Sequence, residues 1–365
     1  MKKIALLPIA ASLCFAYTSA QAQSSVTIYG LVDAAVEHLK NAPTGSITRM
    51  PNLSGTLPSR LGFRGSEDLG DGVRAIFTLE MGFGVDSGAL NQGGRGFGRQ
   101  SFVGVASPMG TVTLGRQYTM LYWSMLDSDL LGPNLFGSGS LDSYFPNARV
   151  DNSIAYRGKF GGFDLGATYS LGRDAVNAGP SPAGTNCAGE SETDRSACRE
   201  WSAMVKYDTP EWGVAGAIEE FRGGAGAFAG LTSSAQTDRR AMVNGWAKLY
   251  GAKLGAGLVD RRNEGSAATP RSKLWWLGVA YPITPLFNVE AQYFKLDYRN
   301  SPNQADLWAL RGTYALSKRT AVYATLGRIN NDGSLAISVS GAAAGGAPAA
   351  GTGQTGIGAG IRHSF

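Results

Sequence analysis

Histidine and cysteine, the side chains most often used for acid–base, nucleophilic or metal chemistry, are few and scattered. The chain has two histidines, His38 and His363, and the sequence identifies no catalytic partner for either one. The glycine run at residues 93–96 lacks the strand-to-helix context of a phosphate-binding loop. We therefore predict no catalytic residue, no metal site, no cofactor and no enzymatic activity.

Arginines and aspartates, by contrast, occur where they could act on ions. Fixed charges on the walls of a water-filled channel select ions and orient dipolar solutes. Arginine suits this role because it stays charged at every physiological pH. The candidates are Arg60, Arg64, Arg74, Arg99 and Arg149, with Asp127 and Asp129 in a long intervening segment. Whether they can line a channel depends on the elements that carry them.

An alternation of apolar and polar residues dominates the sequence and is typical of β-strands. In residues 163–171 the odd positions are Phe, Leu, Ala, Tyr and Leu, whereas the even positions are Asp, Gly, Thr and Ser. Residues 201–208 nearly repeat this pattern, again with aromatic residues bracketing small apolar ones. A soluble β-sandwich also alternates. Aromatic residues at both ends of an apolar face favour instead a strand that crosses lipid between two interfaces.

Segments of this kind recur along the chain and predict an all-β fold, a sixteen-stranded antiparallel transmembrane barrel. The sixteen segments are 26–38, 59–67, 73–83, 98–107, 111–118, 149–158, 163–172, 200–209, 213–222, 240–250, 253–262, 273–282, 286–298, 306–316, 320–329 and 355–365. In 286–298 the alternation slips near Tyr293 and Phe294, which suggests a bulge. In 273–282 both faces are fairly apolar. Short turns alternate mostly with longer polar loops, as in barrels with short periplasmic turns and long outer loops.

The first residues have the form of an export signal. Lys2 and Lys3 precede an apolar run, and Ala20-Gln21-Ala22 has the small-x-small pattern of a cleavage site. We expect residues 1–22 to be the signal and residues 23–365 to form the barrel domain. Loss of the two lysines lowers the net charge from +5 to +3, too weak and scattered to favour nucleic acid.

Two further features concern the mature chain. Cys187 and Cys198 lie in a polar stretch, which predicts a disulfide within the fourth outer loop. The chain stops at Phe365, an aromatic residue on the apolar face of an alternating segment. The outward faces of 26–38 and 355–365 are small and smooth, which predicts that they lie at a subunit interface.

Several motifs together resemble the Gram-negative general porins, in particular the beta-proteobacterial type. They are SVTIYGLVD at 25–33, SRLGFRGSEDLGDG at 59–72, GRQ at 115–117 and GIRHSF at 360–365. The resemblance implies a homotrimer of sixteen-stranded barrels in the outer membrane, through which small hydrophilic solutes and ions diffuse. It implies a third outer loop that folds inward, and a terminal Phe365 that the barrel-assembly machinery reads. It also places Arg60, Arg99 and Arg149 on the wall that faces this loop.

The longest connection, residues 119–148, is the corresponding loop in this chain. It is rich in apolar side chains, including Trp123, Leu130 and Phe136, which need a surface to cover them, and the inside of the barrel wall provides one. Asp127 and Asp129 would then face the arginines. We expect a weak anion preference, because the arginines stand on rigid strands and the net charge is slightly positive.

Strand parity places most of the arginines inside the barrel. Outward Leu61 and Phe63 put Arg60 and Arg64 in the lumen. Outward positions on the neighbouring segments do the same for Arg74 and Arg149, whereas parity is ambiguous at Arg99 beside Gln100.

Other functions fit a barrel less well. A substrate-specific channel would need a ligand constellation or an aromatic track in the lumen, for which Trp246 and Tyr323 are the only hint. A barrel enzyme would need a histidine base with a partner. An adhesive barrel would not need acids facing arginines.

Overall fold

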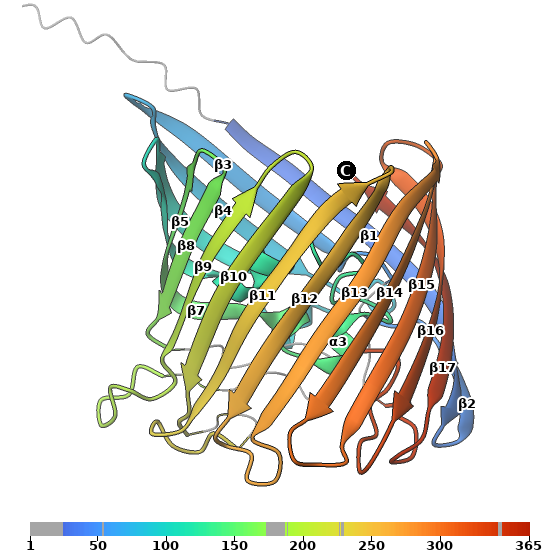
Figure 1. Cartoon of the computed structure of the whole chain (residues 1–365). Coiled ribbons are helices and arrows are strands. Elements are labelled where there is room, and N and C mark those ends of the chain that lie inside the picture. Colours follow the sequence, from blue (N-terminus) through green and yellow to red (C-terminus); the bar gives the residue numbers. More distant parts are fainter. Residues whose placement is uncertain are drawn as a thin grey trace, which may run out of the picture.

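Antiparallel pairing between strands that follow one another in the chain builds one closed β-barrel (Figure 1). The computed structural model describes residues 25–52, 55–172, 187, 189–225, 227, 230–341 and 345–365. The expected signal, residues 1–22, lies outside the described residues. Among the described helices, none is long and apolar enough to cross a membrane.

The described part of the wall has sixteen strands, which agree with the predicted segments to within four residues at each end. They are β1 (Ser25–Ala42), β3 (Arg60–Gly70), β4 (Val73–Gly82), β5 (Gln100–Ser107), β6 (Gly110–Tyr118), β7 (Arg149–Phe160), β8 (Phe163–Ser170), β9 (Glu200–Asp208), β10 (Trp212–Arg222), β11 (Thr237–Leu249), β12 (Ala252–Asn263), β13 (Arg271–Thr284), β14 (Phe287–Tyr298), β15 (Gln304–Ala315), β16 (Thr320–Asn331) and β17 (Gln354–Ser364). The predicted antiparallel barrel is therefore confirmed.

The first strand closes the barrel because it has partners along both edges. One edge pairs with β17, from Leu31 opposite Ser364 to Lys40 opposite Thr355. The first half of the other edge pairs with β3, ending at Leu31 opposite Arg60. Its second half pairs with a short extra strand, β2 (Gly45–Arg49), which folds back along β1. β2 therefore lies beside the loops and is not a seventeenth strand of the barrel wall.

Side chains alternate between the lumen and the outer surface along each strand. On β13, Leu274 and Trp276 are buried inside, whereas Trp275 and Leu277 are exposed outside. Both faces of this segment are apolar because its inner face packs against a loop. The bulge expected near Tyr293 and Phe294 is wrong, since the β14 pairings run through both residues without a register shift. Phe294 simply points inward, where the loop covers it.

Aromatic rings gather at both ends of the outward face of β8–β15. Phe163, Tyr207 and Trp212 contact one another at the end with the short turns, with ring centres 4.8 and 5.6 Å apart. Trp275 and Trp308 flank Tyr293 nearer the other end, at 5.1 and 4.3 Å. Such pairs of belts mark the two interfaces of a lipid bilayer.

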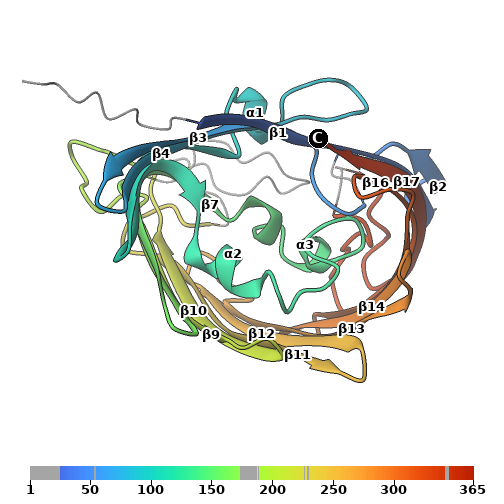
Figure 2. The ribbon, with the colours of Figure 1, turned by 90° about the horizontal axis from the view of Figure 1, so that it is seen from above.

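The third long loop lies inside the barrel, as predicted. Figure 2 shows its helices α2 (Met120–Met125) and α3 (Ser138–Leu141) within the ring of strands. A 3₁₀ turn at Phe145–Asn147 follows α3, whereas the short helix α1 (Asn91–Gly94) belongs to the second loop. Leu121, Leu131 and Phe136 are buried in one cluster with inward side chains of the wall. Burial of this apolar surface holds the loop across the lumen.

The fourth outer loop contains a disulfide between Cys187 and Cys198, whose Cα atoms are 5.2 Å apart. Both cysteines form a small cluster with Ala197, and Ala227 packs both against this cluster and against the core that holds the third loop. We predict that replacing both cysteines with serine leaves the barrel folded and its conductance unchanged, because the strands close elsewhere. Heat-modifiable mobility on gels and single-channel conductance would check this. A double variant that fails to reach the membrane would contradict it.

Candidate functional site

Three arginines on β3 and β4 point into the barrel because of the strand register. Arg60 and Arg64 lie on the face of β3 that the pairing shares with Glu80 of β4, a buried residue of the lumen. The Arg64 guanidinium lies 5.2 Å from the centre of the Tyr29 ring. Arg74 shares the face of Glu80 but lies near the short turn, at the start of β4. These three side chains therefore lie at different depths along the pore.

Arg99 is buried inside the barrel although parity could not place it. It precedes β5, so both Arg99 and Gln100 can turn inward. Its Nε atom lies 2.7 Å from Oε1 of Glu80, and its backbone N–H donates to the Glu80 carbonyl at 3.0 Å. Its terminal nitrogen also donates to the Tyr118 hydroxyl at 2.6 Å. Arg99 is thus a paired, fixed part of the wall.

Arg149 shares the same tyrosine. Its terminal nitrogens donate to the Tyr118 hydroxyl at 2.7 Å and to the Pro146 carbonyl at 3.0 Å, and its guanidinium lies 4.4 Å from the Tyr118 ring centre. Arg149 therefore fixes the end of the third loop to the wall. Sequence reasoning missed Tyr118, because nothing in the pattern distinguishes it from other aromatic residues at strand ends.

A cavity of about 250 Å³ lies between these arginines and the third loop. We call it the arginine cavity; the arginines that line it are Arg60, Arg99, Arg149, Arg311 and Arg362. The last two were not predicted as site residues. Arg311 is paired with Glu290 at 2.6 Å and also donates to loop carbonyls, whereas Arg362 donates to the Thr56 hydroxyl at 3.2 Å.

A piece of the first loop also enters the lumen. Thr56, which lies between β2 and β3, lines the arginine cavity. The Asp33 carboxylate accepts the backbone N–H groups of Thr56 and Leu57 at 3.1 and 3.2 Å and the Tyr323 hydroxyl at 2.5 Å. Sequence reasoning missed this contact. Asp33 is an inward acid on a largely apolar strand, and a buried carboxylate requires hydrogen-bond donors from elsewhere in the chain.

Asp127 of the third loop pairs with the wall beneath it rather than with the arginines. Its carboxylate contacts Lys206 of β9, and Lys253 of β12 at 3.4 Å. Burial disfavours its charge, but these two lysines hold the pKa of Asp127 below its usual value. Much of its charge is therefore compensated on the side of the lumen that carries the loop.

Asp129 is buried at the border of the arginine cavity. It accepts hydrogen bonds from the Ser138 hydroxyl at 2.6 Å and the Gln292 amide at 3.0 Å. Burial raises the pKa of Asp129 to about 6, against the effect of these bonds. The sequence prediction set Asp127 and Asp129 against Arg60 and Arg149, but both acids have partners on other residues.

The cavity consequently carries more positive than negative charge. Glu80 and Glu290 each neutralise one arginine, Arg99 and Arg311. In the described part of the chain Arg60 makes no ion pair and has only partial burial. Fixed charges on the wall of a water-filled passage act on the ions that enter it.

Comparison with known proteins identifies similar channel-forming proteins over most of the chain. The sequence model of the Gram-negative porin family matches residues 10–334. The chain is 31% identical to outer membrane porin protein 32 of Delftia acidovorans over 100% of both chains. It is 27% identical to an outer membrane porin of Bordetella pertussis, over 95% of this chain and 96% of the relative.

Solved structures show the same fold. An anion-selective porin from Comamonas acidovorans superposes with a TM-score of 0.76 at 26% identity, over 94% of this chain and all of that one. The trimer form of OmpT from Vibrio cholerae superposes at 0.64 with 16% identity, over 94% of this chain and 99% of that one. The protein is an outer-membrane general diffusion channel rather than an enzyme, and the chain belongs to the Gram-negative porin family.

Proposed function

We propose that this porin prefers anions and works as a homotrimer. The observation that supports anion preference is the arginine cavity, in which five guanidinium groups meet two paired carboxylates, the buried Asp129 and Asp33 behind Thr56. A relative of known structure is named as anion-selective. Because charges on a pore wall act on every passing ion, the excess of arginine raises the local concentration of small anions.

The test of selectivity is a reversal potential. The purified porin is placed in a planar bilayer between two KCl solutions of different concentration. We expect the potential to have the sign that chloride permeation gives. A potential of zero, or one of the potassium sign, would refute the proposed preference without touching the channel activity.

The outer surface supports a trimer interface along β16, β17 and β1. The middle of the outward face of these strands is apolar, and the face has no aromatic belt in the described residues before the terminal Phe365. Ile28, Val36 and Ile357 are 62%, 49% and 52% exposed in the single chain. An apolar face without interfacial rings is suited to a second subunit rather than to lipid headgroups.

We predict that the native porin migrates as a trimer in mild detergent and inserts into bilayers in conductance steps of three. Native electrophoresis with chemical cross-linking measures the first, and single-insertion recordings the second. Monomers alone, after cross-linking in outer-membrane preparations, would contradict the prediction.

A further inference from the structure

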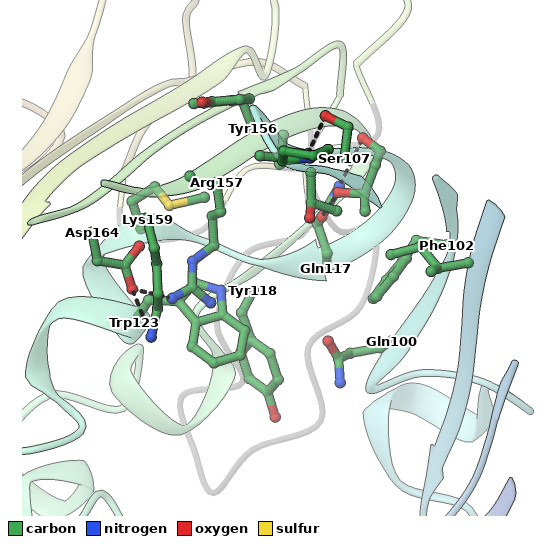
Figure 3. Close-up of a pocket in the computed structure, with 18 residues that line it drawn as sticks. Gln100, Phe102, Ser107, Gln117, Tyr118, Trp123, Tyr156, Arg157, Lys159 and Asp164 are labelled. Atoms are coloured by element: carbon green, nitrogen blue, oxygen red, sulfur yellow. Dashed lines mark hydrogen bonds and ion pairs between the residues drawn. The ribbon is translucent and has the colours of Figure 1, made fainter. Parts of the chain in front are cut away.

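A second and larger cavity lies beside the arginine cavity, on the other side of Tyr118. Its volume is about 530 Å³, and Tyr118 borders both cavities. It lies between α2 of the third loop and the inner faces of β4–β8, and it extends to the short turn at Ser107–Gly110 (Figure 3). We call it the vestibule recess. The recess lies nearer to the short turns than the arginine cavity does.

One side of the vestibule recess is apolar, which is unusual for the wall of a water-filled pore. Phe102 of β5 and Trp123 of α2 line it with partly exposed rings, and Ile76 of β4 is also partly exposed. Met120, by contrast, is fully covered and serves only to hold the loop. The ring of Phe102 and the part of Trp123 that Arg157 leaves uncovered therefore offer a surface on which a planar apolar group can lie.

The other side of the vestibule recess carries charge. The Arg157 guanidinium lies 4.2 Å from the centre of the Trp123 ring, and one terminal nitrogen is 2.8 Å from Asp164. Its buried Nε atom has no hydrogen-bond partner in the described structure. Lys159 is 3.9 Å from Asp164, and its side chain is 78% exposed. Two cations and one carboxylate leave one positive charge beside the aromatic surface.

We propose that the vestibule recess is a transit site for aromatic monocarboxylates. The carboxylate binds the exposed terminal nitrogens of Arg157 and the Lys159 ammonium, and the ring lies against Phe102 and the open part of Trp123. One net positive charge matches a monoanion, and the volume is within the range of small-molecule pockets, about 300–1,000 Å³. The site is open to water, so binding is weak enough for the solute to leave, as conduction requires.

The inference uses the proposed anion preference only for delivery of the solute from the outer side. The experiment therefore adds the probe to each side of the bilayer in turn. The porin is recorded as single channels in about 0.1 M KCl, where charges are still felt over about 10 Å. The probe is phenylacetate, compared with acetate, which lacks the ring, and phenethylammonium, which has the opposite charge.

We expect phenylacetate to reduce the conductance at millimolar concentrations, with acetate and phenethylammonium much weaker. The Arg157→Gln/Lys159→Gln variant should need about ten times more phenylacetate for half-block, because a charge-assisted contact is lost. Phe102→Ala should weaken the block by phenylacetate but leave acetate unaffected. Lys248→Gln is the matched control, because it removes an exposed inward cation of β11 that lines neither the recess nor the arginine cavity, and phenylacetate should block it as it blocks the native porin.

Arg157 also touches the third loop, so its loss could disturb the loop itself. Lys159→Gln alone avoids this, because among the described charged groups the exposed lysine contacts only Asp164. It should raise the half-block concentration while the unblocked conductance stays native. Equal block by phenylacetate and acetate, or native block in both Lys159→Gln and the double variant, overturns the inference. Block that is lost in Arg60→Ser but kept in the recess variants assigns the anion to the arginine cavity and also overturns it.

The same recordings separate the two proposals. A reversal potential without anion preference, together with a block that depends on the recess residues, would refute the proposed selectivity and leave the transit site standing.

Discussion

Replacing Arg60 with serine should lower the ratio of chloride to potassium permeability by about threefold in dilute salt. Three lining arginines, Arg60, Arg149 and Arg362, make no ion pair among the described residues, and of these Arg60 alone also makes no side-chain hydrogen bond there. A unit charge about 6 Å from a passing ion contributes about 0.7 kcal/mol in water, and screening at about 0.1 M salt roughly halves this. Because the charge acts with opposite signs on chloride and potassium, the ratio changes by about 0.7 kcal/mol, which corresponds to about threefold. Reversal potentials of the native porin and Arg60→Ser in the same KCl gradient measure it.

Two comparisons sharpen the Arg60 prediction. The difference should shrink as salt rises, because the Debye length falls from about 10 Å at 0.1 M to about 3 Å at 1 M. Arg74→Ser removes an inward arginine that does not line the cavity, so its effect should be much smaller. Equal shifts for both variants would mean that overall lumen charge, and not the cavity, sets selectivity. Arg149 is a poor choice here, because its bonds to Tyr118 and Pro146 also hold the loop.

Replacing Arg240 with methionine should release the second half of the third loop. Arg240 of β11 is buried, and its guanidinium is 2.9 Å from Asp142 of the loop and 3.3 Å from Asp238. It also lies 4.6 Å from the Tyr144 ring centre. Breaking a buried pair leaves a buried charge without compensation, at a cost of about 3–5 kcal/mol. We expect a larger, noisier conductance and faster protease cleavage within residues 119–148.

The Arg240 prediction has a control and a rescue. Arg239 precedes Arg240 on β11 and is exposed on the outer face, so the conductance of Arg239→Met should match that of the native porin. Adding Asp142→Asn to Arg240→Met removes the stranded charge, while Arg261 still pairs with Asp238 at 2.7 Å. In the double variant the size and the noise of the conductance should both move part of the way back toward the native values. If the conductance of Arg240→Met matched that of the native porin, apolar packing alone would be shown to hold the loop.

Strand alternation was sufficient to predict the barrel because the lipid and the lumen impose opposite polarity on successive residues. The same rule placed Arg60, Arg64 and Arg74 on the inner face. It failed to decide Arg99, because that residue lies in a bend before β5 where the period of two has not begun. The pattern at Phe294 looked like a slip because one lumen wall is apolar where the loop packs on it.

Contacts across the lumen could not be predicted from the sequence, for a different reason. Asp127 meets Lys206 and Lys253 from strands far along the chain, and only the path of the third loop decides which cations it reaches. Tyr118 likewise becomes important because Arg99 and Arg149 converge on its hydroxyl. Such contacts depend on the trajectory of a loop, which no periodicity encodes.

The seam between β1 and β17 has a consequence for the order in which the molecule assembles. Residues from opposite ends of the chain pair there, and Phe365 itself exchanges two backbone hydrogen bonds of 3.1 Å with Gly30. Until the final residues are available, two long strand edges remain open and able to pair with other chains. Contacts between distant residues also make folding slow. The unfolded protein must therefore be kept from aggregating until β17 can pair with β1, and this pairing is the step that closes the barrel.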